Sequence, residues 1–165
     1  MLSTYALPTR ADLTSLALRI ANDPGRWMPI VRFDEQQRWY TRLAVADNHE
    51  VWLLSWLPGQ RTEIHDHGDS AGAFAVAQGV LTETTVCTPA VGGLDGVEVA
   101  LSRKRIRAGM ARGFDADHVH EVTNDTNSPA VSIHVYAPAL TTMNRYRIDD
   151  GVLRLHASER AGADW

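Results

Sequence analysis

Short extended segments separated by turn residues dominate the chain beyond residue 38, and they constrain the fold more than any other feature. Apolar or alternating runs occupy residues 38–45, 50–57, 62–67, 72–76, 79–88, 97–101, 105–108, 118–123 and 131–136. Turn sequences such as Pro58-Gly59, residues 90–93 and Asp149-Asp150-Gly151 separate or follow them. Because no sustained helical periodicity interrupts the series, the sequence predicts an all-β sandwich or barrel rather than a parallel βαβ sheet.

The first thirty residues differ, because they favour a helix. Thr9 offers a capping side chain with Asp12 three positions on. Apolar residues then follow at near-helical spacing: Leu13, Leu16 and Ile20. A chain of 165 residues is of ordinary single-domain size. We therefore expect one domain over residues 1–165, with a helical cap over about 1–30 and a β-barrel over about 38–155.

Composition narrows the class of protein. A formal net charge of −4 argues against a nucleic-acid partner, because such proteins usually carry a basic patch. No apolar run approaches the roughly 18 residues needed to cross a bilayer, and residues 1–6 do not resemble a secretory signal. The single cysteine, Cys87, favours a reducing compartment, and we expect it to be a buried small hydrophobe. We expect a cytoplasmic monomer with no membrane partner.

The seven histidines require an explanation, and Ile64-His65-Asp66-His67 is the most informative of their positions. On a strand, side chains at i and i+2 share a face, so His65 and His67 would project together and could bind one metal ion. A lone His-x-His is equally compatible with a structural pair in a solvated loop. By the same alternation Asp66 points away, and we exclude it as a ligand.

The residues around this pair form a recognisable frame. Glycines stand before and after it, and a second block follows: Gly59, Gly79, Gly109, His120 and Asn124. This order and spacing resembles the two motifs of the cupin superfamily. The usual motif glutamate is replaced here by Ala71 or Gly72. The resemblance therefore implies a metal held by His65, His67 and His120 alone, which leaves coordination positions open as a catalytic metal requires.

A narrower resemblance rests on four segments, spread discontinuously from about residue 39 to 146. They are Tyr40-Thr41-Arg42, His65-Asp66-His67 with Ser70, His120-Glu121-Val122-Thr123-Asn124 and Ser132-Ile133-His134-Val135-Tyr136-Ala137-Pro138. Together they resemble the cysteine dioxygenase family, bacterial type. The resemblance implies a cupin (jelly-roll) barrel, a mononuclear Fe2+ cofactor, and oxidation of the thiol substrate L-cysteine by O2 to cysteine sulfinate.

Ser132, His134 and Tyr136 share one face of a predicted strand. A polar row facing a barrel interior is costly unless its groups bond to one another or to a ligand, although a solvated face is the alternative. The family resemblance implies a hydrogen-bonded chain that holds the Tyr136 hydroxyl near the iron.

Tyr40 and Arg42 share a face on another predicted strand. A guanidinium suits bidentate recognition of a carboxylate, although an arginine on a strand is more often an exposed charge. The resemblance implies that Arg42, assisted by Tyr40, receives the carboxylate of an amino-acid thiol, because relatives with glutamine at this place handle mercaptopropionate.

Two further expectations come from the resemblance. Animal members carry a cysteine at the position of Gly72 that crosslinks to the active-site tyrosine, so we expect no thioether on Tyr136. His118 lies two residues before His120 and could compete as a ligand; the family match favours His120 and places His118 at the pocket rim or in solvent.

Alternatives remain open at this stage. The substrate could be another small thiol, 3-mercaptopropionate or cysteamine, and the chain could instead be a non-catalytic metal-binding cupin with a sensory or structural role. Three imidazoles also suit Zn, Ni or Cu, so iron rests on the family resemblance.

Overall fold

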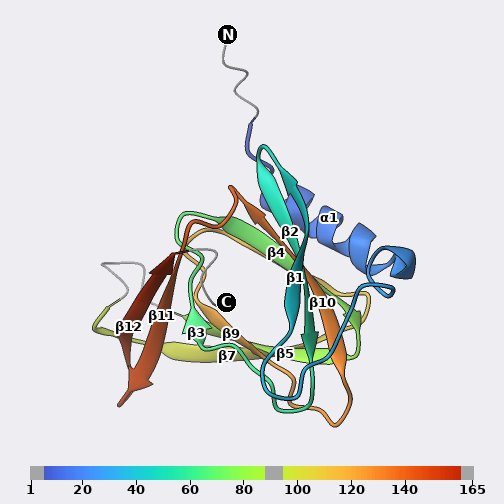
Figure 1. Ribbon diagram of the computed structural model, residues 1–165. Coiled ribbons are helices and arrows are strands. Elements are labelled where there is room, and N and C mark those ends of the chain that lie inside the picture. The colour runs from blue at the N-terminus through green and yellow to red at the C-terminus, as the bar shows by residue number, and fades with distance from the viewer. Residues whose placement is uncertain (1–5, 88–94, 161–165) are drawn as a thin grey trace.

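The computed structural model describes residues 6–87 and 95–160, and it is built from two β-sheets that curl toward each other (Figure 1). The five-stranded sheet has the order β1 (Tyr40–Ala46), β2 (His49–Trp56), β10 (Ala130–Ala137), β4 (Ala71–Gln78), β8 (Ala111–Phe114). The seven-stranded sheet has the order β6 (Val97–Glu98), β12 (Val152–Arg160), β11 (Thr142–Asp149), β3 (Ile64–His65), β9 (His120–Thr123), β5 (Val80–Cys87), β7 (Ala100–Arg107). The predicted all-β barrel is confirmed.

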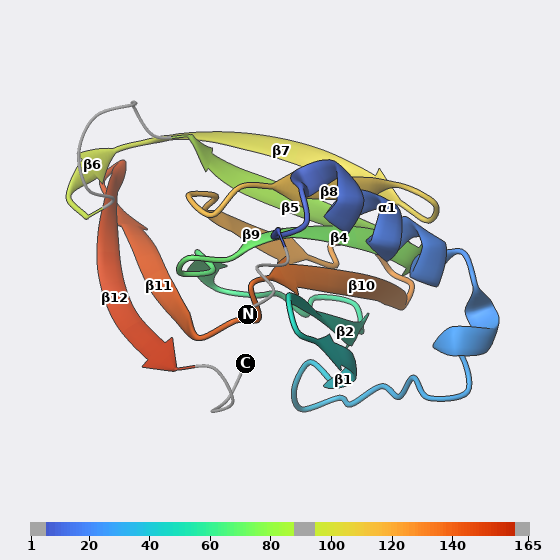
Figure 2. The same cartoon turned by 90° about the horizontal axis from the view of Figure 1, so that it is seen from above.

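One helix, α1 (Arg10–Ala21), covers the outer face of the five-stranded sheet (Figure 2). Thr9 and Asp12 form the predicted capping box, in which each side chain accepts a hydrogen bond from the other's backbone N–H. The apolar face of the helix buries Leu13 and Ile20 in a cluster that includes the outward side chains of β10. A short 3-10 turn, η1 (Pro24–Arg26), follows. The helix is therefore a cap on the outside of the barrel, away from its interior.

Strand β10 is buried along its whole length, with apolar side chains on one face and polar side chains on the other. Val131, Ile133 and Val135 pack in the cluster under the helix. Ser132, His134 and Tyr136 alternate with them and are also buried. Because this polar row is enclosed, the solvated-face alternative is excluded.

The structure differs from the sequence predictions in its C-terminal part. Strands β8, β11 and β12 were not expected, whereas the turn at 149–151 was; it joins β11 to β12 as a hairpin. Few side chains of these two strands are buried, so the sequence of the hairpin shows only a weak alternation of apolar and polar residues. The hairpin matters for the site because β11 pairs with β3 and places Arg145 opposite His65.

Two smaller points complete the description. Cys87 is exposed at the end of β5, so the expectation of a buried thiol was wrong. The turn expected at 90–93 lies outside the described residues. Among those residues, no helix has the length and apolar character needed to cross a membrane.

Candidate metal centre and substrate pocket

Three buried histidines meet where β3 and β9 run side by side. His65 lies on β3 opposite His120 on β9, and His67 follows two residues after His65. Their ring centroids are 4.8 Å apart for His65 with His67 and with His120, and 5.0 Å apart for His67 with His120. One ring nitrogen from each lies within 4.8 Å of the others. Strand register thus brings His120 to a pair of histidines, His65 and His67, from which it is distant in sequence.

The hydrogen bonds of these rings leave nitrogens free to face one another. The Nδ1 of His65 donates to the carbonyl oxygen of Glu63 at 2.8 Å, and the Nδ1 of His120 donates to Glu83 at 2.8 Å. Neither nitrogen of His67 has a partner, although the residue is only 1% exposed. A buried imidazole without a partner costs free energy, and a metal ion would give one of its nitrogens a partner. The residues present therefore fit a bound metal.

Electrostatics favours the neutral form of these rings. Burial lowers the pKa of His65, His67 and His120, and the proximity of other imidazoles lowers it further. All three are then neutral at pH 7, which is the form of histidine that binds metals.

Glu83 orients His120, and sequence reasoning missed it. Its buried carboxylate accepts hydrogen bonds from Arg112 Nε at 2.8 Å, His118 Nε2 at 2.9 Å and His120 Nδ1 at 2.8 Å. Burial alone would raise the pKa of Glu83, but these hydrogen bonds lower it far below the usual range. In the sequence, Glu83 is one polar residue among the threonines of the predicted strand 79–88, and nothing there marks it as part of the site.

His118 also faces Glu83. Glu83, His118 and His120 form a second group of donors within metal-binding reach of one another. However, both oxygens of Glu83 already accept hydrogen bonds, and the ring of His118 stacks on Phe114 with centroids 4.8 Å apart. The geometry therefore directs His118 toward Glu83 rather than toward His65 and His67.

A chain of hydrogen bonds runs along the inward face of β10. Trp56 Nε1 donates to Ser132 Oγ at 2.8 Å, Ser132 Oγ lies 2.8 Å from His134 Nε2, and His134 Nδ1 lies 3.3 Å from the Tyr136 hydroxyl. Burial lowers the pKa of His134 to about 3, so its ring is neutral and offers one donor and one acceptor. If Ser132 donates to Nε2, then Nδ1–H donates to the Tyr136 oxygen. The phenolic proton is then left for the pocket.

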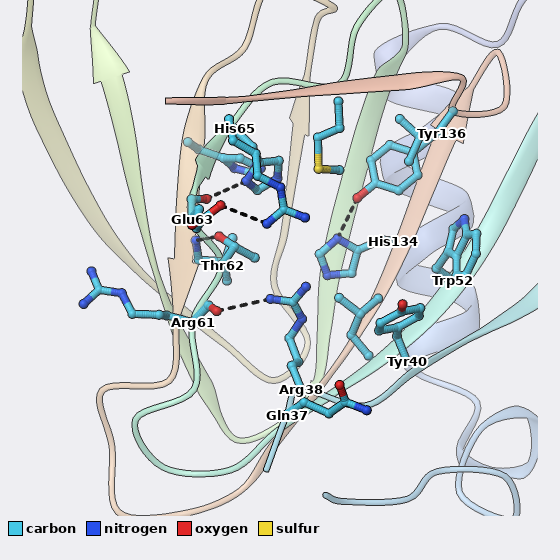
Figure 3. Close-up of a pocket in the computed structure, with 16 residues that line it drawn as sticks. Gln37, Arg38, Tyr40, Trp52, Arg61, Thr62, Glu63, His65, His134 and Tyr136 are labelled. Carbon is cyan, nitrogen blue, oxygen red and sulfur yellow. Dashed lines mark hydrogen bonds and ion pairs between the residues drawn. The ribbon is translucent and has the colours of Figure 1, made fainter. Parts of the chain in front are cut away.

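The site opens into a pocket of about 400 Å³ (Figure 3). Its lining includes His65, His120, His134 and Tyr136, and Tyr40 lies on its wall as the sequence suggested. Arg38, Arg61 and Arg145 also line it, and none of them was singled out in the sequence.

Arg42 is not among the residues that line this pocket. Its side chain is 53% exposed, with Nη1 3.7 Å from Glu50 Oε2 and Cζ 5.6 Å from the Trp52 ring. The pairing of β1 with β2 is irregular between Arg42 and Ala44. Arg42 therefore does not reach the pocket as expected, although it shares a strand with Tyr40.

Gly72 lies directly opposite Tyr136 in the sheet. A Cβ atom at this position would stand 2.7 Å from the Phe114 ring and 2.9 Å from Tyr136 Cδ1. A side chain at residue 72 would therefore require the Phe114 ring to shift. This crowding is consistent with the expectation that Tyr136 carries no crosslink there, which stays a prediction.

Asp66 is buried and belongs to the frame of the site. It accepts hydrogen bonds from the Tyr146 hydroxyl at 2.8 Å and from the backbone N–H of Asn144 at 3.1 Å. These contacts tie the turn that carries His67 to β11. Asp66 is not part of either group of possible metal ligands among the described residues.

Comparison with known proteins agrees with this geometry. A family model described as cysteine dioxygenase type I matches residues 10–149. The cysteine dioxygenase type 1 of Bos taurus is 29% identical over 131 residues, covering 76% of this chain and 63% of that protein. This chain thus spans less than two thirds of the length of the relative.

Two solved structures show the fold. A conserved protein with a double-stranded β-helix domain from Klebsiella pneumoniae superposes with a TM-score of 0.52 at 16% identity, covering 79% of this chain and 93% of that chain. A cupin superfamily protein from Desulfitobacterium hafniense has a TM-score of 0.50 at 12% identity, covering 68% and 87%. The predicted cupin barrel is confirmed.

Proposed function

Because the chain belongs to the cysteine dioxygenase type I family, we propose that it is a thiol dioxygenase that converts L-cysteine to cysteine sulfinate. One observation supports this most directly: three buried imidazoles converge beside the ring of Tyr136, which lines the pocket, and one of them, His67, has no hydrogen-bond partner. Such an arrangement suits a metal with open positions for substrate.

His65, His67 and His120 would hold the metal. Ferrous iron bound there would supply open positions for the thiol and for O2, favour the thiolate and overcome the spin barrier of dioxygen. Glu83 keeps the Nδ1 of His120 protonated, and the carbonyl of Glu63 does the same for His65, so both rings present Nε2.

Tyr136 lines the pocket and would supply a hydrogen-bond donor to the substrate. Its pKa is raised by burial, so the phenol keeps its proton at neutral pH. When Ser132 donates to His134 Nε2, the chain that begins at Trp56 leaves this proton for the pocket. We propose that Tyr136 orients the bound substrate, and that Ser132 and His134 position Tyr136.

The overall reaction requires no further reactant. The thiol loses its S–H proton, two S–O bonds form, and the O–O bond of dioxygen breaks. Sulfur is oxidised by four electrons and the two oxygen atoms are reduced by four in total. Both atoms of O2 therefore enter the sulfinate.

The test is oxygen uptake by iron-loaded protein over L-cysteine, 3-mercaptopropionate and cysteamine, with the sulfinate product measured. We expect L-cysteine to be oxidised fastest, with one sulfinate formed per O2 consumed. Zinc-loaded protein is the control and should consume no oxygen. Faster oxidation of 3-mercaptopropionate would change the substrate assignment, and no oxidation of any thiol would contradict the enzyme proposal.

A further inference from the structure

His67 is held in a different way from the other two candidate metal ligands. His65 and His120 lie on paired strands, and a hydrogen bond at Nδ1 orients each ring. His67 lies beyond the end of β3, in the segment that leads to β4, and neither of its ring nitrogens has a hydrogen-bond partner. The ring of His67 must therefore be oriented by something other than a hydrogen bond.

The flat face of Phe114 lies against His67. The two ring centroids are 4.7 Å apart and the ring planes differ by 23°, which is a stacked arrangement. Tyr136 is a second neighbour, but its ring is farther away, at 5.1 Å and 30°. His120 meets Phe114 edge-on, at 5.3 Å and 61°. Among the three candidate ligands, the ring that lacks a hydrogen bond is thus the one that stacks on Phe114.

Phe114 is itself firmly held. It lies at the end of β8, which pairs with β4, and is only 3% exposed. The ring of His118 stacks on it at 4.8 Å and 16°, and His118 Nε2 is fixed by Glu83 at 2.9 Å. The ring also fills the space beside Gly72, where a Cβ atom would lie 2.7 Å from it. These contacts make Phe114 a rigid support for a neighbouring ring.

We propose that Phe114 is a positioning residue for His67, which it orients by ring stacking in place of a hydrogen bond. This inference rests on the proposed function, because it takes His67 as a metal ligand. Stacking restricts the tilt of the imidazole plane and occupies neither nitrogen, so a nitrogen stays available to the metal. An aliphatic side chain at residue 114 would remain apolar but would not supply a flat face.

The experiment compares Phe114→Leu with Phe74→Leu, using metal binding alone. Phe74 is the matched control because it is a buried ring of the same hydrophobic cluster. It stacks on His134 at 5.2 Å and 15°, and meets His120 only at 6.1 Å and 58°. Co2+ affinity is measured by competition with a chelator, and the visible absorption spectrum of the cobalt-loaded protein and the thermal unfolding midpoint are recorded.

We expect Phe114→Leu to weaken Co2+ binding by roughly 3- to 10-fold, the size of the free energy that an aromatic pair contributes beyond its buried area. Its absorption bands should shift, because one of the three donors is less well oriented. Phe74→Leu should also lower the unfolding midpoint but keep Co2+ affinity within about twofold and the wild-type spectrum. Phe114→Met, another aliphatic replacement, should weaken Co2+ binding as well and serves if the leucine variant does not fold.

Three results would overturn the proposal. Equal loss of Co2+ affinity in Phe114→Leu and Phe74→Leu would mean that general core packing matters rather than stacking on His67. Wild-type affinity and spectrum in Phe114→Leu would show that the ring of His67 is held by other contacts. Wild-type protein that binds no Co2+ would exclude the inference together with the metal centre.

The proposed function can fail separately. Variants that behave as expected with Co2+, from a wild-type protein that oxidises no thiol when loaded with iron, would contradict the dioxygenase activity while supporting the role of Phe114.

Discussion

The histidines of the two sheets face the same pocket, but they differ in what their second nitrogen contacts. On the seven-stranded side, His65 and His120 each use Nδ1 for a hydrogen bond and keep Nε2 without one. On the five-stranded side, His134 uses both nitrogens, for Ser132 and for Tyr136. All are buried, so burial does not separate them. The hydrogen-bond partners divide these rings into candidate metal ligands and a positioning residue.

The largest effect should come from removing one histidine ring from each sheet, which tests the division into metal ligands and a positioning residue. Substitutions of residues that only hydrogen-bond to a metal ligand typically weaken metal binding by roughly 10- to 100-fold. His120→Ala should weaken iron binding by more than this, because it removes a direct donor. His134→Gln should retain its iron. The measurement is iron bound per chain after dialysis. His118→Ala is the matched control, and a greater loss of iron in His118→Ala than in His120→Ala would reverse the assignment.

The next largest effect should come from the carboxylate behind His120. Glu83→Gln removes the charge that fixes the Nδ1 proton, so we expect iron affinity to fall by roughly 10- to 100-fold. Competition with a chelator measures this affinity. Glu121→Gln, on the same strand as His120, alters a carboxylate that faces Arg61 instead and should leave affinity unchanged.

On the five-stranded side, the expected defect lies in turnover rather than in iron binding. Tyr136→Phe removes the proposed hydrogen bond to substrate and should lower kcat by about 10-fold while the iron content is retained. Ser132→Ala keeps the hydroxyl of Tyr136 but disturbs its orientation, and should lower kcat by less. Steady-state oxygen uptake tests both variants. Full activity of Tyr136→Phe would contradict the role proposed for the tyrosine.

A further effect should be one that the two sides share. Burial depresses the pKa of His134 to about 3 and also lowers that of the candidate ligand rings. Their stabilising contribution is full above the unfolded pKa near 6.5 and is lost as pH falls toward the folded value. For metal-free protein, each such histidine should steepen the loss of unfolding free energy by at most about 1.4 kcal/mol per pH unit.

Urea unfolding of metal-free protein at several pH values between 7 and 4 measures this slope. His134→Gln should show a shallower dependence than wild type, since one group no longer gains a proton on unfolding. An identical slope in both proteins would show that His134 does not titrate as described.

The parts of the molecule that could be predicted from the sequence are those in which local spacing carries the information. Alternation along residues 131–136 predicted the row of Ser132, His134 and Tyr136, and Thr9 with Asp12 predicted the start of the helix. The hairpin of β11 and β12 was missed because it buries little apolar surface, so its alternation is weak.

The rest of the site depends on relations between strands. Glu83 meets His120 because β5 pairs with β9, and no local spacing reports that pairing. Alternation placed Tyr40 and Arg42 on one face but could not show where along the strand the pocket ends. Arg38 begins the predicted run 38–45, but alternation along that run could not show that Arg38 lines the pocket with His134.

The crowding at Gly72 has a consequence for the population of molecules. A protein in which a neighbouring side chain crosslinks to the tyrosine after folding exists as a mixture of crosslinked and uncrosslinked molecules. Here Phe114 occupies the space where such a neighbour would lie, and the single cysteine is exposed at the end of β5. Every newly folded chain should thus already have its final covalent structure at Tyr136, so preparations should be chemically homogeneous at this residue whatever their history of turnover.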